Sequence, residues 1–215
     1  MSTPRRAAQR RVWVVRHGSR LDFEDPSWQE RAARPHDPPL ADAGHREARA
    51  VAEALTGEPI EALFSSPFLR CVQTARPIAE GLGLPIRIEP GLSEWLNTEW
   101  FPQPPELQGL DELGRAAPAI DPLYQPMGRA TYGESGLDAL RRSGEVTRRL
   151  VDAFAGDLVL VGHGASVLGA IAGLLGIEPG SEAEKALPEP PYGSLAGLVK
   201  QGTGWRWALR PTRFA

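Results

Sequence analysis

The sequence predicts an α/β fold, in which a mostly parallel central sheet is the middle layer of a three-layer α/β/α sandwich. Three observations predict it. Short apolar runs alternate with segments of helical periodicity along the chain. The apolar runs are rich in β-branched residues and lack polar alternation, which is typical of parallel strands covered on both faces. The 215 residues suit one hydrophobic core, and we find no internal repeat.

The pattern of the first half of the sequence predicts three strands and two helices. The strands are expected at residues 12–15, 60–64 and 86–88. Asp42 is suited to cap a helix that ends before Gly57. Ser66 is suited to cap a second helix that begins at Pro67, and Pro77 is expected to kink it. Strands and helices therefore alternate, as they do in a parallel sheet with helical crossovers.

The pattern of the second half of the sequence predicts a further strand, two helices and a terminal hairpin. The longer helix starts at Ser135 and has Leu137, Leu140 and Leu150 along one apolar face. Gly202-Thr203-Gly204 lies between the last two apolar runs and favours a turn. The other elements are a strand at residues 158–161, a helix at residues 166–175, and hairpin strands at residues 195–199 and 205–209.

Two long segments, residues 19–39 and 95–133, contain recurrent prolines and show no clear periodicity. Irregular segments of this length in a compact domain are usually functional loops. We expect both to be lids over a ligand site. Residues 1–10 form a third irregular segment, for which we expect a flexible basic arm ahead of a single domain at residues 11–215.

The composition argues against several classes of protein. A formal net charge of -3 gives no basic surface for nucleic acid or an anionic membrane. No apolar run approaches the roughly 20 residues of a membrane span, and no signal-peptide stretch follows the N-terminal arginines. Cys71 is the only cysteine, which excludes an intrachain disulfide. We expect a cytoplasmic protein without nucleic-acid or membrane partners.

Two histidines directly follow predicted buried strands. His17 comes after the first strand, and His163 comes after the strand at residues 158–161. Ligands of open α/β sheets bind at the carboxyl ends of the strands, so these side chains are expected to meet in one pocket. Each histidine is followed by glycine, which lets the backbone approach a ligand closely. Taken alone, each is equally well explained as an ordinary hydrogen-bonded histidine near a strand end.

Arginines lie near these histidines in a pattern that suits phosphate. Arg16 and Arg20 flank His17, and Arg70 lies in the first turn of the helix after Ser66-Pro67. A phosphate dianion is bound well by guanidinium groups and by the N–H groups at a helix N-terminus. The sequence therefore predicts a phosphate pocket, although the spacing of Arg70 alone also suits a solvated helix arginine.

Three motifs occur in an order that resembles the histidine phosphatase (phosphoglycerate mutase-like) superfamily. They are Arg16-His17-Gly18 after an apolar strand, a Ser-Pro-x-x-Arg-x-x-Gln-Thr-Ala stretch at residues 66–75, and Gly162-His163-Gly164 after a late strand. The resemblance spans residues 11–176. Residues 16–20, 69–75 and 89–95 are similar, more specifically, to the phosphatase domain of the Sts proteins.

The resemblance implies a phosphoglycerate mutase-like fold in which His17 becomes phosphorylated and Glu94 is the proton donor. It also implies a phosphate pocket made of Arg16, Arg20, Arg70 and His163. A homodimer is suggested by the resemblance alone.

The chemistry of a phosphohistidine is consistent with these residue types. A neutral imidazole whose other nitrogen donates to a backbone carbonyl keeps one lone pair for attack. Fixed cations stabilise the charge on the phosphoryl oxygens, and a carboxylic acid protonates the leaving oxygen. We expect the neighbouring Trp95 to raise the pKa of Glu94. Glu99 and Glu134 lie in or beside the second irregular segment and remain alternative proton donors.

The sequence therefore predicts a metal-independent phosphomonoester hydrolase that acts through a phosphohistidine. We expect no metal and no cofactor, because there is neither a carboxylate cluster nor a glycine-rich phosphate loop. A phosphomutase of the phosphoglycerate mutase type and an inactive phosphate-binding module remain alternatives. The expected substrate is a small phosphorylated metabolite or a phosphotyrosine-like ester. Trp28, Trp95 and Trp100 lie in the expected lids, where they either stack on an aromatic leaving group or pin the loops.

Overall fold

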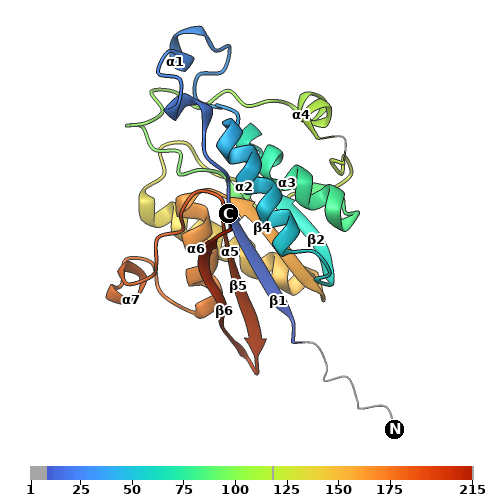
Figure 1. Cartoon of the computed structure of the whole chain (residues 1–215). Helices are drawn as coiled ribbons and strands as arrows, with labels where there is room; N and C mark the ends of the chain where they lie inside the picture. Colours follow the sequence, from blue (N-terminus) through green and yellow to red (C-terminus); the bar gives the residue numbers. More distant parts are fainter. Residues whose placement is uncertain (1–8, 118, 215) are drawn as a thin grey trace.

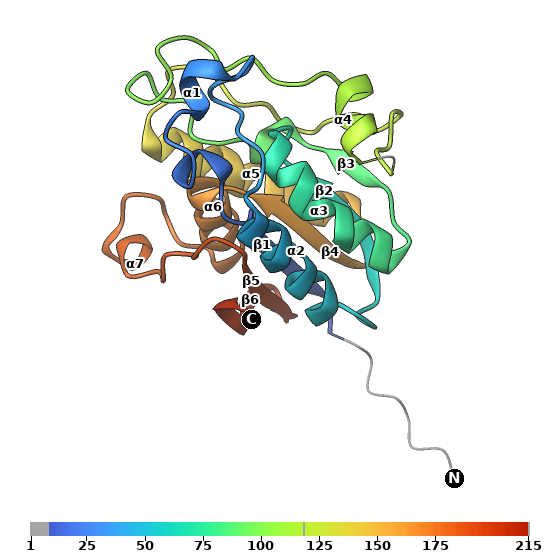
Figure 2. The same ribbon diagram turned by 45° about the horizontal axis from the view of Figure 1, so that its top comes forward.

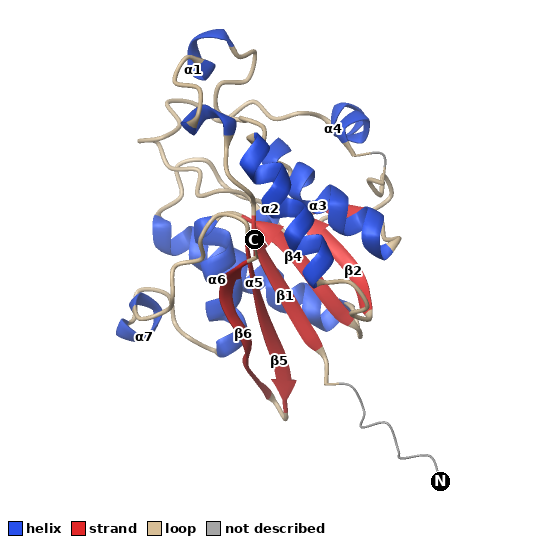
Figure 3. Cartoon of the chain, viewed as in Figure 1, coloured by secondary structure: helices blue, strands red, loops and turns tan. Residues whose placement is uncertain are grey.

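The central feature of the computed structural model, which describes residues 9–117 and 119–214, is a six-stranded sheet (Figures 1 and 3). Its strands are β1 (Arg11–Arg16), β2 (Ile60–Ser65), β3 (Ile86–Ile88), β4 (Asp157–Gly162), β5 (Ser194–Gln201) and β6 (Gly204–Arg213). The strand order is β3-β2-β4-β1-β5-β6. The strands from β3 to β1 are parallel, and β5 and β6 are antiparallel to their neighbours. The predicted mostly parallel sheet is confirmed.

Helices cover both faces of the sheet, as Figure 2 shows. On one face, α2 (Asp42–Ala54) and α3 (Leu69–Leu82) share an apolar core with Val159 and Val161 of β4. On the other face, α5 (Gly136–Ala153) and α6 (Gly164–Leu175) share a core with Leu158 and Leu160. Alternate residues of a strand point to opposite faces, so the continuous apolar run of β4 serves both cores. The predicted three-layer α/β/α sandwich is the observed fold.

The two irregular segments contain short helices that the sequence analysis did not predict. The first holds η1 (Leu21–Phe23) and α1 (Trp28–Arg31), and the second holds α4 (Leu110–Ala116). Such elements are too short to show a helical period. The segments contact each other, since Arg34 Nη2 donates to Glu112 Oε2 at 2.9 Å, and both lie above the carboxyl ends of the parallel strands (Figures 1 and 2). Their role as lids stays a prediction. The remaining short helices are η2 (Pro90–Leu92) and α7 (Glu182–Lys185).

The strand order brings the ends of β1 and β4 together. The two strands are parallel neighbours, and Arg16 lies opposite Gly162 in the register. The amide of His17 donates to the carbonyl of Gly162 at 2.9 Å, which extends this pairing by one residue. Residues that follow β1 and β4 therefore emerge side by side at the edge where open α/β sheets bind ligands.

Several local predictions were wrong. α2 begins at Asp42 with Ala41 as its N-cap, so Asp42 is not the capping residue. α3 begins at Leu69 rather than Pro67, because Phe68 keeps an extended backbone. Leu137 was expected on the apolar face of the long helix, but it is 42% exposed.

The expected basic arm, residues 1–10, falls mostly on residues 1–8, which lie outside the described residues. Arg10 belongs to the fold, because its Nε donates to the carbonyl of Gly156 at 2.9 Å and its own carbonyl accepts from the amide of Lys200 at 2.8 Å. Within the described part of the chain, no helix combines the length and the apolar content needed to cross a bilayer.

Candidate active site

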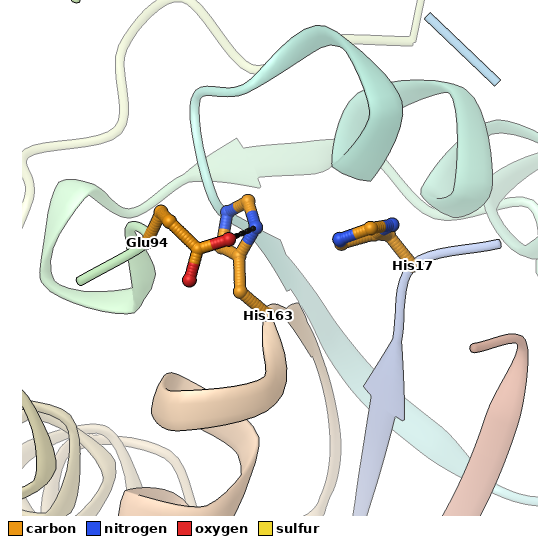
Figure 4. A group of neighbouring side chains, drawn as sticks. All are labelled: His17, Glu94 and His163. Atoms are coloured by element: carbon orange, nitrogen blue, oxygen red, sulfur yellow. Dashed lines mark ion pairs between the residues drawn. The ribbon is translucent and has the colours of Figure 1, made fainter. Parts of the chain in front are cut away.

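His17 and His163 meet at the carboxyl edge of the sheet, as predicted. Their ring centroids lie 5.1 Å apart in an edge-to-face arrangement. Both side chains are almost completely buried, with 1% and 0% exposed. Figure 4 shows His17 at the end of β1, His163 at the turn between β4 and α6, and Glu94 pointing at His163 from the loop after η2. Residues far apart in the sequence thus form one cluster.

The surroundings of His17 fix which ring nitrogen can react. Nδ1 lies 2.8 Å from the carbonyl of Gly18, which can only accept, so Nδ1 carries the proton. Nε2 then keeps its lone pair and accepts from Arg70 Nε at 3.3 Å. Burial lowers the pKa of His17 well below its usual value of 6.5, and the charges of Arg70 and His163 lower it further. His17 is therefore a neutral imidazole whose Nε2 carries no proton.

The glycine after His17 is required by packing, and its role in the approach to a ligand stays a prediction. A Cβ atom on Gly18 would lie 2.5 Å from the carbonyl oxygen of Gly44 in α2, which is a severe overlap with backbone. A Cβ on Gly44 would likewise lie 2.2 Å from the carbonyl oxygen of Ser19. The two glycines let α2 pack directly against the loop that holds His17.

Arg70 joins the catalytic candidates into one network from the first turn of α3. Its guanidinium donates from Nη2 to Glu94 Oε2 at 3.3 Å and lies 3.2 Å from His163 Nδ1, in addition to its contact with His17. The side chain is 1% exposed, which rules out a solvated helix arginine. Arg70 Nη1 has no hydrogen-bond partner among the described residues. A buried donor without a partner at this point is available for a phosphoryl oxygen.

His163 is held in place by a residue whose role the sequence analysis missed. Ser66 Oγ lies 2.8 Å from His163 Nε2, so Ser66 orients the imidazole instead of capping α3. Burial lowers the pKa of His163 to about 4, with Glu94 opposing and Arg70 adding to the shift. His163 is thus neutral at physiological pH. The only sequence feature that pointed to Ser66 was its place before Pro67, and we interpreted that feature wrongly as a helix cap.

Glu94 is the carboxylate that the structure brings to the histidines. Glu94 Oε2 lies 3.2 Å from His163 Nδ1. Burial opposes its ionisation, but His163 and Arg70 outweigh burial and hold the pKa of the carboxyl well below its usual range. The expectation that Trp95 raises this pKa was therefore wrong. The contacts with His163 and the Arg70 charge together outweigh burial, so the carboxyl is ionised.

The alternative proton donors lie elsewhere. Glu134 is 5% exposed at its side chain and accepts from Arg142 Nε at 2.9 Å in a close ion pair. Glu99 is exposed to solvent. Of these three carboxylates, Glu94 alone lies within hydrogen-bonding distance of His163 in the described structure.

Arg16 and Arg20 lie at the mouth of the site. Arg16 Nη1 donates to the carbonyl of Pro190 at 2.7 Å, and its guanidinium lies 3.8 Å from the centre of the Tyr192 ring. Arg20 Nε donates to Asp22 Oδ1 at 2.9 Å. Arg16 Nε is buried without a hydrogen-bond partner among the described residues, which leaves it available to a ligand. The structure thus places all the predicted phosphate-binding side chains around one site, and their binding role stays a prediction.

A cleft of about 1000 Å³ opens directly from this site. Its polar end is lined by Arg16, Arg20, Glu94 and the first two residues of α6, Gly164 and Ala165. The first turn of an α-helix has N–H groups without intrahelical acceptors and a positive dipole end. This helix terminus is therefore suited to an anion, and the sequence analysis did not assign it a role.

The loop that carries Glu94 is fixed by two residues that the sequence analysis also missed, the buried Glu89 and the partly buried Arg142. Glu89 is 0% exposed and its carboxylate accepts from four donors, which are the amides of Gly91, Met127 and Gly128 and the hydroxyl of Tyr124. Arg142 donates to the carbonyls of Gly91, Ser93 and Glu94 at 2.8, 3.2 and 3.1 Å. No local sequence pattern marks such contacts, because both residues act across the fold.

The donor atoms of His17, Glu94 and His163 all lie within 4.8 Å of one another, a spacing that can hold a metal ion. The Arg70 guanidinium contacts each of the three residues. A divalent cation at the same point would meet a fixed positive charge at short range. These residues suit an anion better than a cation, and the expected absence of a metal stays a prediction.

Comparisons with known proteins agree with this geometry. The family model described as histidine phosphatase superfamily (branch 1) matches residues 12–210. Human ubiquitin-associated and SH3 domain-containing protein A is 31% identical over 211 residues, which cover 80% of this chain and 32% of that protein. The ecdysteroid-phosphate phosphatase of Drosophila melanogaster is 27% identical over 240 residues, which cover 93% of this chain and 32% of that protein. The chain thus spans about a third of the length of these curated relatives.

A solved structure shows the same fold. The ecdysone phosphate phosphatase of Bombyx mori, crystallised in complex with tungstate, superimposes with a TM-score of 0.78 and 23% identity, and the match covers 95% of both chains. The range matched by the family model, residues 12–210, spans the part of the chain in which the side chains of the site lie. This chain therefore belongs to branch 1 of the histidine phosphatase superfamily.

Proposed function

We propose that this protein is a metal-independent phosphomonoester hydrolase that forms a phosphohistidine on His17. The observation that carries the proposal is the state of the His17 ring. The Gly18 carbonyl holds the Nδ1 proton, and the Nε2 lone pair faces the Arg70 guanidinium. A buried neutral imidazole next to a fixed cation is suited to attack a phosphorus atom whose oxygens that cation binds.

In the first step, Nε2 of His17 attacks the phosphorus atom as the bond to the ester oxygen breaks. Negative charge spreads over the three equatorial oxygens during this transfer. Arg70 Nη1 and Arg16 Nε, both buried without hydrogen-bond partners among the described residues, are available to these oxygens. Arg20, His163 and the N-terminus of α6 complete the proposed pocket. These groups are fixed before substrate binds, so they stabilise the transition state with little reorganisation.

Glu94 moves the proton. Its carboxylate is ionised before substrate binds, but a phosphate dianion beside it adds a like charge, which raises the pKa of a carboxyl. Glu94 therefore takes up a proton from solvent as the dianion binds, and it passes this proton to the leaving oxygen, which departs as an alcohol or phenol. Water then attacks the phosphohistidine while Glu94 takes one of its protons. The overall reaction consumes one water and yields the alcohol and inorganic phosphate.

A phosphomutase uses the same phosphohistidine but returns the phosphoryl group to a bound acceptor. Incubation with 2- and 3-phosphoglycerate separates the two activities, because a mutase interconverts them whereas a hydrolase releases phosphate. An inactive phosphate-binding module is disfavoured by the intact set of nucleophile, cations and carboxylate.

The proposal is tested by phosphate release from p-nitrophenyl phosphate with EDTA present. We expect the wild type to be active, His17→Ala to be inactive, and His45→Gln on α2 to match the wild type. Rapid quenching with labelled substrate should trap a phosphoenzyme that is stable in base and labile in acid. A His17→Ala protein as active as the wild type, or complete loss of activity in EDTA, would contradict the mechanism.

A further inference from the structure

We propose that the preferred substrate carries a large apolar alcohol or phenol without a carboxylate group as its leaving group. This inference rests on the proposed phosphatase function, because it concerns the cleft that opens from the phosphate pocket. It goes further by choosing between the metabolite and aromatic classes that the sequence left open.

The lining of the cleft is mostly apolar, and two of its aromatic rings stack on the arginines of the proposed phosphate pocket, Tyr192 on Arg16 and Phe23 on Arg20. It includes Phe23, Trp95, Trp100, Tyr192, Leu137 and Leu140. Ligand sites are typically lined by apolar and aromatic side chains, with a few polar groups that set orientation. Here Arg16, Arg20 and Glu94 adjoin the proposed phosphate pocket, and apolar side chains make up most of the remaining lining, so the part of the substrate beyond the ester oxygen meets mainly hydrocarbon and aromatic rings.

The same cleft collects large apolar side chains that are exposed to solvent. Phe23 is 61% exposed, Trp100 is 56% exposed and Leu137 is 42% exposed. These residues belong to three different parts of the chain, yet all three line this cleft. Exposed apolar side chains that cluster around a cavity usually indicate a binding surface, because they do not contribute to the buried core.

The aromatic rings are held in pairs. Trp95 and Trp100 pack edge to face with centroids 5.2 Å apart, and Phe23 and Tyr192 do the same at 5.9 Å. Paired rings lose little further freedom when a ligand covers them, so an apolar leaving group binds them at low entropic cost. Trp28 differs, because its indole nitrogen donates to the carbonyl of Pro35 at 3.2 Å and it does not line the cleft. Trp28 pins its own loop.

The charges at the cleft disfavour a second anionic group on the substrate. Glu184 and Glu189 also line the cleft, and the one lysine in the lining, Lys185, is paired with Glu182 at 2.7 Å. The two arginines of the lining already have acidic partners, Glu189 for Arg16 and Asp22 for Arg20. A carboxylate on the leaving group would therefore meet acidic side chains or arginines that are already paired, so phosphoglycerates are poor candidates. A small polar alcohol would also leave most of the cleft of about 1000 Å³ unfilled.

The test compares substrates that differ in size but share the type of leaving group. Phenyl phosphate is paired with 4-biphenylyl phosphate, and ethyl phosphate is paired with octyl phosphate. We expect the larger member of each pair to have a kcat/KM at least about tenfold higher, which equals about 1.4 kcal/mol. 3-Phosphoglycerate should be hydrolysed more slowly than any of them, and a phosphotyrosine peptide more slowly than 4-biphenylyl phosphate.

Variants locate the preference in the cleft. Trp100→Ala should reduce the ratio of kcat/KM for 4-biphenylyl over phenyl phosphate by about fivefold or more, as expected for the loss of one stacked ring. Leu123→Ala is the control, because Leu123 is 83% exposed and lies outside the cleft, and it should keep the wild-type ratio. Equal kcat/KM values within each pair, or a phosphotyrosine peptide as the best substrate, would overturn this inference but leave the proposed function standing. No phosphate release from any ester would overturn the proposed function instead.

Discussion

Asp37 Oδ1 lies 3.8 Å from Arg70 Nη1, and both side chains are almost completely buried. The same Asp37 oxygen accepts from the amide of Leu69 at 2.9 Å, at the first residue of α3. Asp37 therefore ties the end of the 19–39 segment to the helical turn that carries the central arginine of the site. Burial raises the pKa of Asp37 to about 6, and the charge of Arg70 offsets part of that effect.

The first prediction concerns the pH dependence of stability. The native pKa of Asp37, about 6, lies above its ordinary value of 3.8. The native state then binds more protons than the unfolded state in this range, so this group contributes less stability as pH rises from about 4 to about 6. Asn does not titrate. The free energy of unfolding of Asp37→Asn relative to the wild type should therefore rise between about pH 4 and pH 7, by up to about 3 kcal/mol.

Urea unfolding of both proteins across this pH range measures the difference. Asp111→Asn changes an exposed aspartate in α4 and serves as the control, whose difference from wild type should not vary in this way. A difference for Asp37→Asn that falls as pH rises would show that the Arg70 charge, not burial, governs Asp37.

The second prediction concerns the shape of the Arg70 side chain. Lysine keeps the charge but has a single nitrogen, which cannot reach His17, His163 and Glu94 together as the guanidinium does. Arg70→Lys should reduce kcat/KM for p-nitrophenyl phosphate by about 100-fold or more. Arg76→Lys on the same helix changes an exposed arginine paired with Glu80 and should stay close to the wild type. A reduction of only a few-fold in Arg70→Lys would mean that charge alone suffices.

The third prediction separates Glu94 from Glu134. Without the carboxyl of Glu94, leaving groups that need a proton suffer most, so Glu94→Gln should lose about 100-fold or more on ethyl phosphate and much less on p-nitrophenyl phosphate. Glu134→Gln weakens the ion pair with Arg142, which fixes the backbone at Glu94, so both substrates should slow by a similar factor. Glu99→Gln is the exposed control. If Glu134→Gln instead showed the dependence on the leaving group, the proton donor would have to be reassigned.

The fourth prediction concerns the protonation of the paired histidines. Burial lowers the pKa of His17 well below 6.5 and that of His163 to about 4. Nitrogen-15 NMR of the free protein should therefore show both rings neutral from about pH 5.5 to 8, with the His17 proton on Nδ1. His17→Gln and His163→Gln assign the signals among the four histidines of the chain. A midpoint near 6.5 for either ring would contradict the buried neutral pair.

The sequence could predict those parts of the fold and site that follow from local pattern. Buried apolar runs place β1 and β4, and a histidine directly after each must reach the carboxyl edge. The pKa of Glu94 could not be predicted in this way, because it depends on Arg70 and His163, which only the fold brings near. Ser66 was assigned to the wrong partner for the same reason, since a serine before a proline has an ordinary local interpretation as a helix cap. Contacts between distant segments decide both cases.

The fifth prediction concerns Glu89, which shows how the loop carrying Glu94 depends on such a contact. Each carboxylate oxygen accepts two hydrogen bonds, from Gly91 and Gly128 at Oε1 and from Tyr124 and Met127 at Oε2. Glu89→Gln turns one acceptor into a donor that faces two donors in a buried site. Its unfolding free energy should fall by about 3 kcal/mol or more.

Tyr124→Phe removes one of these four donors and leaves the carboxylate with three, so it should cost only about 1 kcal/mol. Denaturant unfolding of both variants and of the wild type measures the loss of unfolding free energy that each substitution causes. Losses of equal size would mean that the tyrosine hydroxyl, rather than the carboxylate that gathers four donors, holds this loop. Because η2 leads directly into Glu94, a loosened Glu89 should also weaken hydrolysis of ethyl phosphate more than that of p-nitrophenyl phosphate.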